Sequence, residues 1–204
     1  MSKVLNAGNR LDGLGAFAAD DARELNVVIE TPKGSRNKFT YDDALGLFEL
    51  GGVLPSGAVF PFDFGFVPAT TGGDGDPLDA LVLMDEPAFT GCLVRVRLLG
   101  VIEAEQTERD GETTRNDRLV GLAAESRLHR KVRSLSALDE NLLEEIEHFF
   151  VSYNRIKGKE FKPLARSGPK RAFELVEQGA REFRRARGKR SGQAGRKRVV
   201  RKTS

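Results

Sequence analysis

The sequence feature that most restricts the possible folds is a series of short apolar runs separated by turn residues. Each run is about as long as one β-strand. The runs that predict strands are residues 25–29, 39–41, 45–50, 80–84, 92–102 and 117–122. Glycine, proline and aspartate punctuate the connections between them. The run at 92–102 is long enough to cross a small barrel. None approaches the roughly 18 consecutive apolar residues of a transmembrane helix, so we expect no contact with a membrane.

Two helical segments follow these runs. In residues 137–153 the apolar side chains recur at three- and four-residue steps, which predicts a helix with Ser136 as its N-cap. A second helix is predicted over 169–187, because Pro169 suits a first helical turn and apolar residues recur along one side. Many short strands followed by two helices indicate an α+β domain.

An acidic loop, residues 73–79, lies just before the run at 80–84 and is called the aspartate loop below. Its sequence, Gly-Asp-Gly-Asp-Pro-Leu-Asp, places three carboxylates within six residues. Such carboxylates repel one another unless a cation lies among them, so the spacing favours a hard metal ion with oxygen ligands. The alternative is a simple Gly/Asp/Pro turn. An EF-hand is excluded, because positions six and twelve counted from Asp74 are both aspartate.

Length and composition set further limits. A chain of 204 residues suits one domain with a sizeable core. The single Cys92 lies in an apolar, strand-like run, which predicts a buried thiol. It has no partner for an intrachain disulfide, which predicts a reducing, cytoplasmic location. Two histidines argue against a histidine-based zinc site. No continuous apolar stretch follows Lys3, so we expect no secretory signal.

The charge is divided unevenly along the chain, although its formal net value is only +3. Eleven Lys or Arg and one Glu lie between Arg181 and Ser204, which leaves the preceding part acidic. We expect residues 1–22 to form a loosely structured arm, 23–187 the folded domain, and 188–204 a basic, disordered tail. The tail would contact a polyanion such as nucleic acid or polyphosphate, or serve only to keep the protein soluble.

Several motifs in a fixed order carry a family resemblance. In chain order they are Val27-Val28-Ile29-Glu30-Thr31-Pro32, Asn37-Lys38-Phe39, Phe60-Pro61-Phe62-Asp63-Phe64-Gly65-Phe66-Val67, the aspartate loop, Arg118-Leu119-Val120-Gly121-Leu122, and His148-Phe149-Phe150 with Tyr153 and Lys157-Gly158-Lys159. Over residues 25–162 this order resembles the soluble, Mg²⁺-dependent, single-domain inorganic pyrophosphatases. The resemblance implies that residues 23–187 form a five-stranded OB-like β-barrel flanked by two helices. It also implies hydrolysis of inorganic pyrophosphate or a related phosphate-bearing molecule, Mg²⁺ or Mn²⁺ as cofactor, and a homo-oligomer.

The resemblance further implies roles for acidic and polar residues. Asp74 and Asp79 match metal ligands, and Asn116 stands where the family has another metal-binding aspartate. Asp76 matches the general base that assists the attacking water. Glu30 matches an acidic residue on the metal and leaving-group side of the site.

The implied phosphate contacts are Lys38, Tyr153 and Arg118, the last in place of a lysine. Other positions depart from the family pattern. They are Thr40 for a glutamate, Gly52 for an arginine, Phe60 and Phe64 for two tyrosines, Asn116 for an aspartate, Asp110 or Gly111 at another metal-binding aspartate, and Asn154 for a lysine.

These departures bear on activity. A hydrogen bond to a charged group contributes about 1.5–3 kcal/mol, so losing the Arg, Lys and Tyr contacts would remove about 4–9 kcal/mol, or three to six orders of magnitude. Cations at nearby positions would either replace these lost phosphate contacts or be solvated surface charges. These cations are Arg115, Arg155, Lys157 and Lys159. Reduced pyrophosphatase activity is the leading hypothesis. The alternative is an inactive pyrophosphatase-like protein that binds phosphate ligands, nucleic acid or a protein partner.

Overall fold

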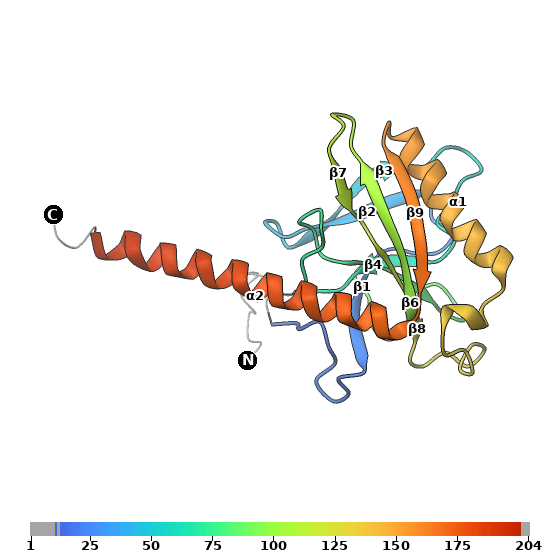
Figure 1. Ribbon diagram of the computed structural model, residues 1–204, viewed down its shortest axis with the longest axis horizontal. Helices are drawn as coiled ribbons and strands as arrows, with labels where there is room; N and C mark the ends of the chain where they lie inside the picture. Colours follow the sequence, from blue (N-terminus) through green and yellow to red (C-terminus); the bar gives the residue numbers. More distant parts are fainter. Residues whose placement is uncertain (1–10, 12, 201–204) are drawn as a thin grey trace, which may run out of the picture.

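A closed five-stranded barrel forms the centre of the computed structural model, which describes residues 11 and 13–200 and the side chains as far as residue 189 (Figure 1). In ring order the strands are β1 (Glu24–Thr31), β4 (Asp63–Phe66), β5 (Asp79–Leu83), β8 (Arg118–Ala123) and β6 (Leu93–Thr107). The ring closes because β1 pairs with both β4 and β6. Four of these pairings are antiparallel, and β5–β8 is parallel. The predicted α+β class and OB-like barrel are confirmed.

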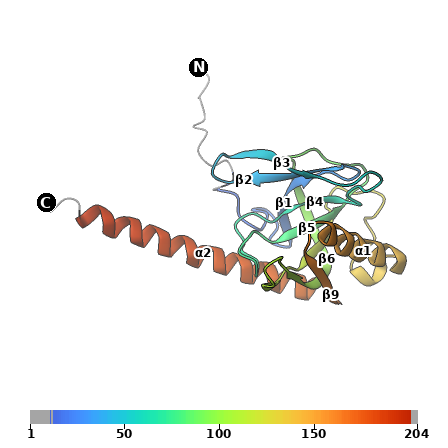
Figure 2. The same cartoon turned by 90° about the horizontal axis from the view of Figure 1, so that it is seen from above.

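Shorter elements surround the barrel. Strands β2 (Asn37–Asp42) and β3 (Leu47–Val53) form the predicted hairpin as a separate sheet, which lies as a layer beside the barrel in Figure 2. Strands β7 (Thr113–Arg115) and β9 (Glu160–Ser167) both pair with β6. The helical elements are η1 (Leu135–Ala137), α1 (Glu140–Ile156) and α2 (Pro169–Val200).

Strand β6 joins most of these elements. It is 15 residues long and pairs first with β1, then with β8, and at its end with β7 and β9. Register shifts at Leu98/Gly100 and Glu103/Ala104 let it bend from one partner to the next. A Cβ at Gly100 would lie 2.3 Å from the Ser167 carbonyl oxygen, so only glycine allows β9 to approach here.

The core has two clusters because the barrel strands are buried on both faces. In β5, Val82 belongs to a cluster that includes Val176 of α2. Its neighbour Leu81 belongs to the other cluster, which includes Phe150 of α1. A strand covered on both faces needs apolar residues at every position, which explains the unbroken apolar run at 80–83.

Two predicted details are wrong. Helix α1 begins at Glu140 rather than at 137, and its N-cap is Asp139, whose Oδ1 accepts a hydrogen bond from the Asn141 N–H at 2.9 Å. Ser136 lies in η1 instead. Cys92 is half-buried rather than buried, because it lies in a turn just before β6, where its N–H donates to the Phe89 carbonyl.

The ends of the described chain differ from each other. Residues 1–10 and 12 of the expected arm lie outside the described residues, but Phe17 forms a β-bridge to Leu25, and the Asn26 side chain donates to the Gly15 carbonyl at 2.7 Å. This part of the arm packs on the barrel.

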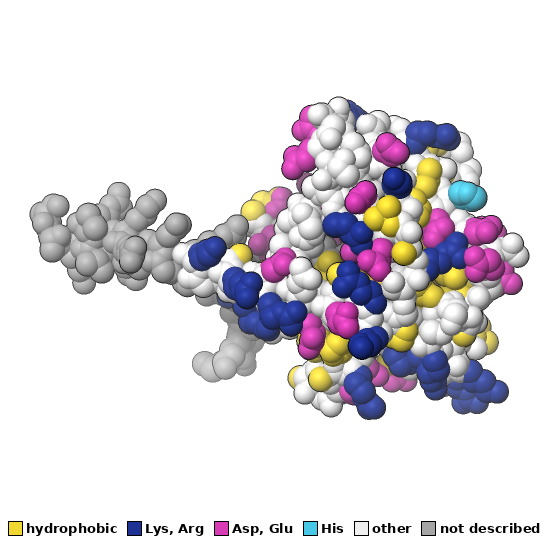
Figure 3. Space-filling model, viewed as in Figure 1, with side chains coloured by type: hydrophobic (Ala, Val, Ile, Leu, Met, Phe, Trp, Pro, Cys, Tyr) yellow, Lys and Arg dark blue, Asp and Glu magenta, His cyan; other side chains and the backbone are white. Residues whose placement is uncertain are grey.

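Helix α2 extends past the expected end at Arg187 to Val200, leaving the barrel in Figures 1 and 2. Figure 3 shows Lys and Arg side chains gathered where it leaves. Residues 188–200 of the expected tail continue helix α2, and residues 201–204 lie outside the described part. None of the described helices has an apolar stretch sufficient to cross a membrane.

Candidate active site

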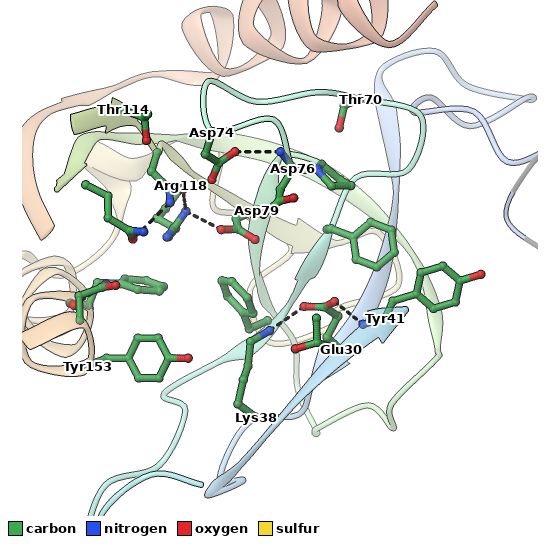
Figure 4. A pocket seen from close by; sticks show the side chains of 18 of the residues that line it. Glu30, Lys38, Tyr41, Thr70, Asp74, Asp76, Asp79, Thr114, Arg118 and Tyr153 are labelled. Atoms are coloured by element: carbon green, nitrogen blue, oxygen red, sulfur yellow. Dashed lines mark hydrogen bonds and ion pairs between the residues drawn. The ribbon is translucent and has the colours of Figure 1, made fainter. Parts of the chain in front are cut away.

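A cavity of about 730 Å³ opens where the barrel, the β2–β3 hairpin, the aspartate loop and the end of α1 meet. It contains every site residue predicted from the sequence, although these residues come from widely separated parts of the chain (Figure 4). They are Glu30, Lys38, Asp74, Asp76, Asp79, Asn116, Arg118 and Tyr153.

On the hairpin side, Glu30 and Lys38 form a fixed pair. Glu30, at the end of β1, is buried, and its carboxylate lies 2.6 Å from the Lys38 ammonium of β2. The second Glu30 oxygen accepts a hydrogen bond from the Tyr41 N–H at 2.9 Å. The Lys38 ammonium also lies 4.6 Å from the centre of the Phe64 ring. These contacts hold one lysine charge at the cavity wall.

Hydrogen bonds within the aspartate loop and to Thr70 stabilise the conformation of the loop. Gly75 has φ +92°, which favours glycine, and the Asp76 N–H donates to Asp74 Oδ1 at 3.1 Å. Behind the loop, the buried Thr70 hydroxyl accepts a hydrogen bond from the Leu78 N–H at 3.0 Å. The loop is therefore a turn, as one reading of the sequence held, and it also carries its carboxylates into the cavity.

The electrostatics of the loop favour a bound cation. Asp74 is exposed as a residue, but partial desolvation of its carboxyl group beside the cavity raises its pKa. The hydrogen bond from the Asp76 N–H lowers this pKa, and the negative charges of Asp79 and Asp76 raise it. The Asp76 carboxylate has no hydrogen bond or ion pair among the described residues. A positive ion in this part of the cavity would relieve the repulsion among the three groups.

Arg118 of β8 binds Asp79, the last residue of the aspartate loop. The two residues are direct partners in the parallel β5–β8 pairing, and their charged groups lie 2.5 Å apart. The Arg118 guanidinium also donates to the Asn116 amide oxygen and lies 5.0 and 5.3 Å from the ring centres of Phe150 and Phe161. Arg118 is buried, and its Nε has no hydrogen-bond partner in the described structure.

The remaining wall comes from α1, the turn after it and the β6–β7 hairpin. Burial raises the pKa of Tyr153, so its hydroxyl keeps its proton, and it accepts a hydrogen bond from the Lys157 ammonium. Lys159 pairs with Glu108 at 2.7 Å. The sequence prediction missed four polar residues of β6, β7 and their connection that line this wall. They are Gln106, Glu108, Glu112 and Thr114.

Known proteins are similar to this chain in sequence and in fold. The inorganic pyrophosphatase family model matches residues 27–184. The chain belongs to the inorganic pyrophosphatase family. Within the family, an inorganic pyrophosphatase of Synechocystis is 35% identical over 160 residues, covering 78% of this chain and 92% of the relative. That of Thermus thermophilus is 38% identical over 144 residues, covering 70% and 79%.

Solved structures of the family agree with the barrel. The Thermus thermophilus inorganic pyrophosphatase superposes with a TM-score of 0.77 at 33% identity, covering 85% of this chain and 98% of that structure. The Helicobacter pylori enzyme superposes with a TM-score of 0.73 at 32% identity, covering 80% and 95%.

The structure places three of the departures from the family pattern. Asn154 is buried at the cavity wall, and its neutral amide donates to the Phe150 carbonyl within α1 at 2.9 Å. Gly52 lies opposite Lys38 in the hairpin and does not line the cavity. Asp110 accepts from the Glu112 N–H in an exposed turn and also lies outside the cavity.

Among the cations weighed as replacements, Arg115 is already engaged. Its guanidinium binds Glu103 at 2.9 Å and Asp117 at 2.8 Å, outside the main cavity. Lys157 and Lys159 do line the cavity. Arg155 is exposed on α1 and lies outside it.

The donor set fits a hard divalent cation. In the part of the chain that the structure describes, no three Asp, Glu, His or Cys side chains converge on one ion position. Magnesium commonly uses only one or two carboxylates and completes its shell with water and phosphate oxygens. Asp74 and Asp79 supply such carboxylates. The Asn116 oxygen already accepts from Arg118, which uses one of its two lone pairs.

Proposed function

We propose that this family member hydrolyses inorganic pyrophosphate to two phosphates in a reaction that needs Mg²⁺, with Mn²⁺ as an alternative ion. The observation that carries the proposal is one cavity that holds the three carboxylates of the aspartate loop together with the cationic side chains of Lys38, Arg118 and Lys157. A cation would offset the negative charge of the loop, and the oxygens of a phosphoanhydride would accept hydrogen bonds from the cationic groups. The inactive alternative has no observation in its favour.

Asp76 is the proposed general base. Its carboxylate is exposed at the cavity wall and has no competing hydrogen bond among the described residues. It can therefore accept the proton that a water molecule loses as its oxygen attacks one phosphorus atom. The bond from that phosphorus to the bridging oxygen breaks, and the second phosphate leaves with that oxygen.

Asp74 and Asp79 would hold the divalent cation. Such an ion, when bound, neutralises phosphate charge and lowers the pKa of coordinated water. The Glu30–Lys38 pair keeps the lysine ammonium directed at the cavity rather than at solvent. Lys38, Arg118 and the protonated Tyr153 hydroxyl would donate to phosphate oxygens, which positions the substrate for attack.

Replacing the base tests this proposal. Asp76→Asn keeps the shape and the backbone hydrogen bond of the loop but cannot accept the proton, so kcat should fall about 10²- to 10⁴-fold. Asp20→Asn is the matched control, because Asp20 is exposed and lies outside the cavity, so this variant should behave like the parent. Phosphate release from pyrophosphate measures both. An Asp76→Asn variant as active as the parent would overturn the assignment.

We also propose a cytoplasmic homo-oligomer. The unpaired Cys92 suits a reducing compartment. The exposed apolar side chains Leu47 and Val53 of β3 and Phe89 are 63, 58 and 70% exposed, and a subunit interface would cover such groups. Sedimentation velocity tests the oligomer, and a monomer at micromolar concentration would reject it.

The basic part of α2 is proposed to contact a polyanion. Arg184, Arg185 and Lys189 are exposed beyond the last packed turns of the helix. Binding through phosphates would weaken steeply as salt rises. Affinity for a polyphosphate chain that is independent of salt, or unchanged when Arg184, Arg185 and Lys189 are all replaced by glutamine, would reject this contact.

A further inference from the structure

The cationic side chains around the cavity differ in whether a carboxylate already neutralises them. Four line it, namely Lys38, Arg118, Lys157 and Lys159. Lys38, Arg118 and Lys159 each have a salt bridge, with nitrogen–oxygen distances of 2.5 to 2.7 Å. Across residues 11 and 13–189, no carboxylate forms a salt bridge with Lys157. Among the four cationic side chains of the cavity, Lys157 is therefore the one that has no salt bridge to a carboxylate of the described residues.

The position of Lys157 is fixed by the end of α1. It is the C-cap residue of this helix, its N–H donates to the Asn154 carbonyl at 2.9 Å, and its own carbonyl accepts from Arg109 Nε at 2.8 Å. Its side chain turns back over the helix, so that the ammonium lies 4.3 Å from the Tyr153 ring centre and donates to the Tyr153 hydroxyl. The charge is held at the cavity rather than left to move in solvent.

The surroundings of the Lys157 ammonium disfavour its charged form. Lys157 is half-buried, and burial lowers its pKa, as does the positive charge of Lys159 to a smaller degree. An anion beside it would offset both effects. The Tyr153 oxygen already accepts from Lys157, which leaves the hydroxyl proton free to be donated to the same anion.

The neighbouring position cannot supply this charge. The family pattern has a lysine directly after the helix tyrosine, where this chain has Asn154. Asn154 is buried and bonded to its own helix. Lys157 follows one turn later and reaches the cavity from the same end of α1.

We propose that Lys157, together with Tyr153, anchors a phosphate group of the substrate in place of the lysine missing at Asn154. The proposal rests on the proposed function for its substrate but concerns phosphate binding by itself. Lys157 is thus a substrate-binding residue, and its charge offsets part of the loss caused by the departures from the family pattern.

Calorimetric titration of inorganic phosphate, and of the unreactive analogue imidodiphosphate, into the full-length protein with Mg²⁺ tests this. Lys157→Met should weaken binding of both probes about 10- to 100-fold, and Lys157→Arg should recover most of the loss. Arg155→Met is the matched control, because it removes the same charge two residues away but outside the cavity. It should bind within about twofold of the parent. Unchanged thermal unfolding midpoints would show that all variants fold.

The possible outcomes distinguish phosphate binding by Lys157 from hydrolysis of pyrophosphate. Parent-like binding by Lys157→Met, an equal loss in Arg155→Met, or no phosphate binding by the parent would each overturn the anchor. A parent that binds phosphate through Lys157 but releases none from pyrophosphate would support the anchor and reject the proposed hydrolysis. In steady-state kinetics with an active parent, Lys157→Met should raise KM for pyrophosphate more than it lowers kcat. A loss confined to kcat would contradict an anchoring role.

Discussion

Arg118 shows how a single residue links the fold to the chemistry of the cavity. The register of β5 and β8 sets it directly opposite Asp79, and the planar guanidinium can bind Asp79 and Asn116 together while lying over two aromatic rings. A lysine would carry the same charge but has a single point of attachment. At this position the two cations are not interchangeable.

Arg118→Lys is therefore expected to lower kcat/KM for pyrophosphate about tenfold, because one charged hydrogen bond is lost. It should also reduce the free energy of unfolding by about 1–3 kcal/mol, since the contacts with Asn116 and the rings weaken. Steady-state kinetics and urea unfolding measure the two effects. Arg115→Lys is the control, because Arg115 binds Glu103 and Asp117 outside the main cavity and should affect stability alone. Equal loss of activity in both variants would contradict the assignment.

The sequence was informative about residues that belong to short motifs. All eight predicted site residues line one cavity, but the pairing of Asp79 with Arg118 was not foreseen, because it depends on a strand register that no local pattern carries. Gln106 and Glu108 were missed for a similar reason. They are polar residues of a hairpin, and only the tertiary structure brings them to the cavity.

At the scale of elements, Glu103 joins four of them. From β6 its carboxylate accepts hydrogen bonds from Ser167 of β9 at 2.7 Å, from Arg115 of β7 at 2.9 Å and from Arg171 of α2 at 3.4 Å. The hydrogen bond from the Ser167 hydroxyl, with those from Arg171 and Arg115, lowers the pKa of Glu103. The ionised group thus holds β7, β9 and α2 against β6.

This lowered pKa predicts a pH dependence of stability. A carboxyl group with a lower pKa in the folded state stabilises the protein above its unfolded pKa of about 4.3, and this stabilisation is lost as pH falls through the folded value. Glu103→Gln should reduce the free energy of unfolding by about 1–3 kcal/mol at pH 7, and the difference from the parent should shrink below pH ~4. Urea unfolding at several pH values measures it. A difference that stays constant from pH 7 to pH 3 would contradict this account.

Elements with a regular apolar pattern were predicted correctly, and irregular ones were not. The barrel strands β1, β5, β6 and β8 gave clear apolar runs because they have buried residues on both faces. Strand β9 gave no such signal, since it carries charged residues and Pro163. Proline is tolerated there because it lies at the register shift between Glu103 and Ala104 of β6. The start of α1 was misplaced because Ser136 and Asp139 are both acceptable caps, and only the fold selects Asp139.

On the scale of the whole molecule, α2 lies against Leu78 of the aspartate loop and against the chain just before it, and then carries the exposed residues Arg184, Arg185 and Lys189. The Thr71 N–H donates to the Gly179 carbonyl at 3.1 Å, and a Cβ at Gly179 would lie only 3.1 Å from the Thr71 oxygen. Further along the helix, Phe183 lines the cavity itself. The helix thus supports the loop from behind before it leaves the barrel.

The whole molecule is built around a cavity that brings the carboxylates of the aspartate loop together with the cationic side chains of Lys38, Arg118 and Lys157. The most direct test of the function of this cavity is to measure phosphate release from inorganic pyrophosphate by the parent protein at increasing Mg²⁺ concentration, with a chelator as the control. We predict two phosphates per pyrophosphate consumed, a rate that rises with Mg²⁺, and complete loss with the chelator. No release above the protein-free background with either Mg²⁺ or Mn²⁺ would contradict the account.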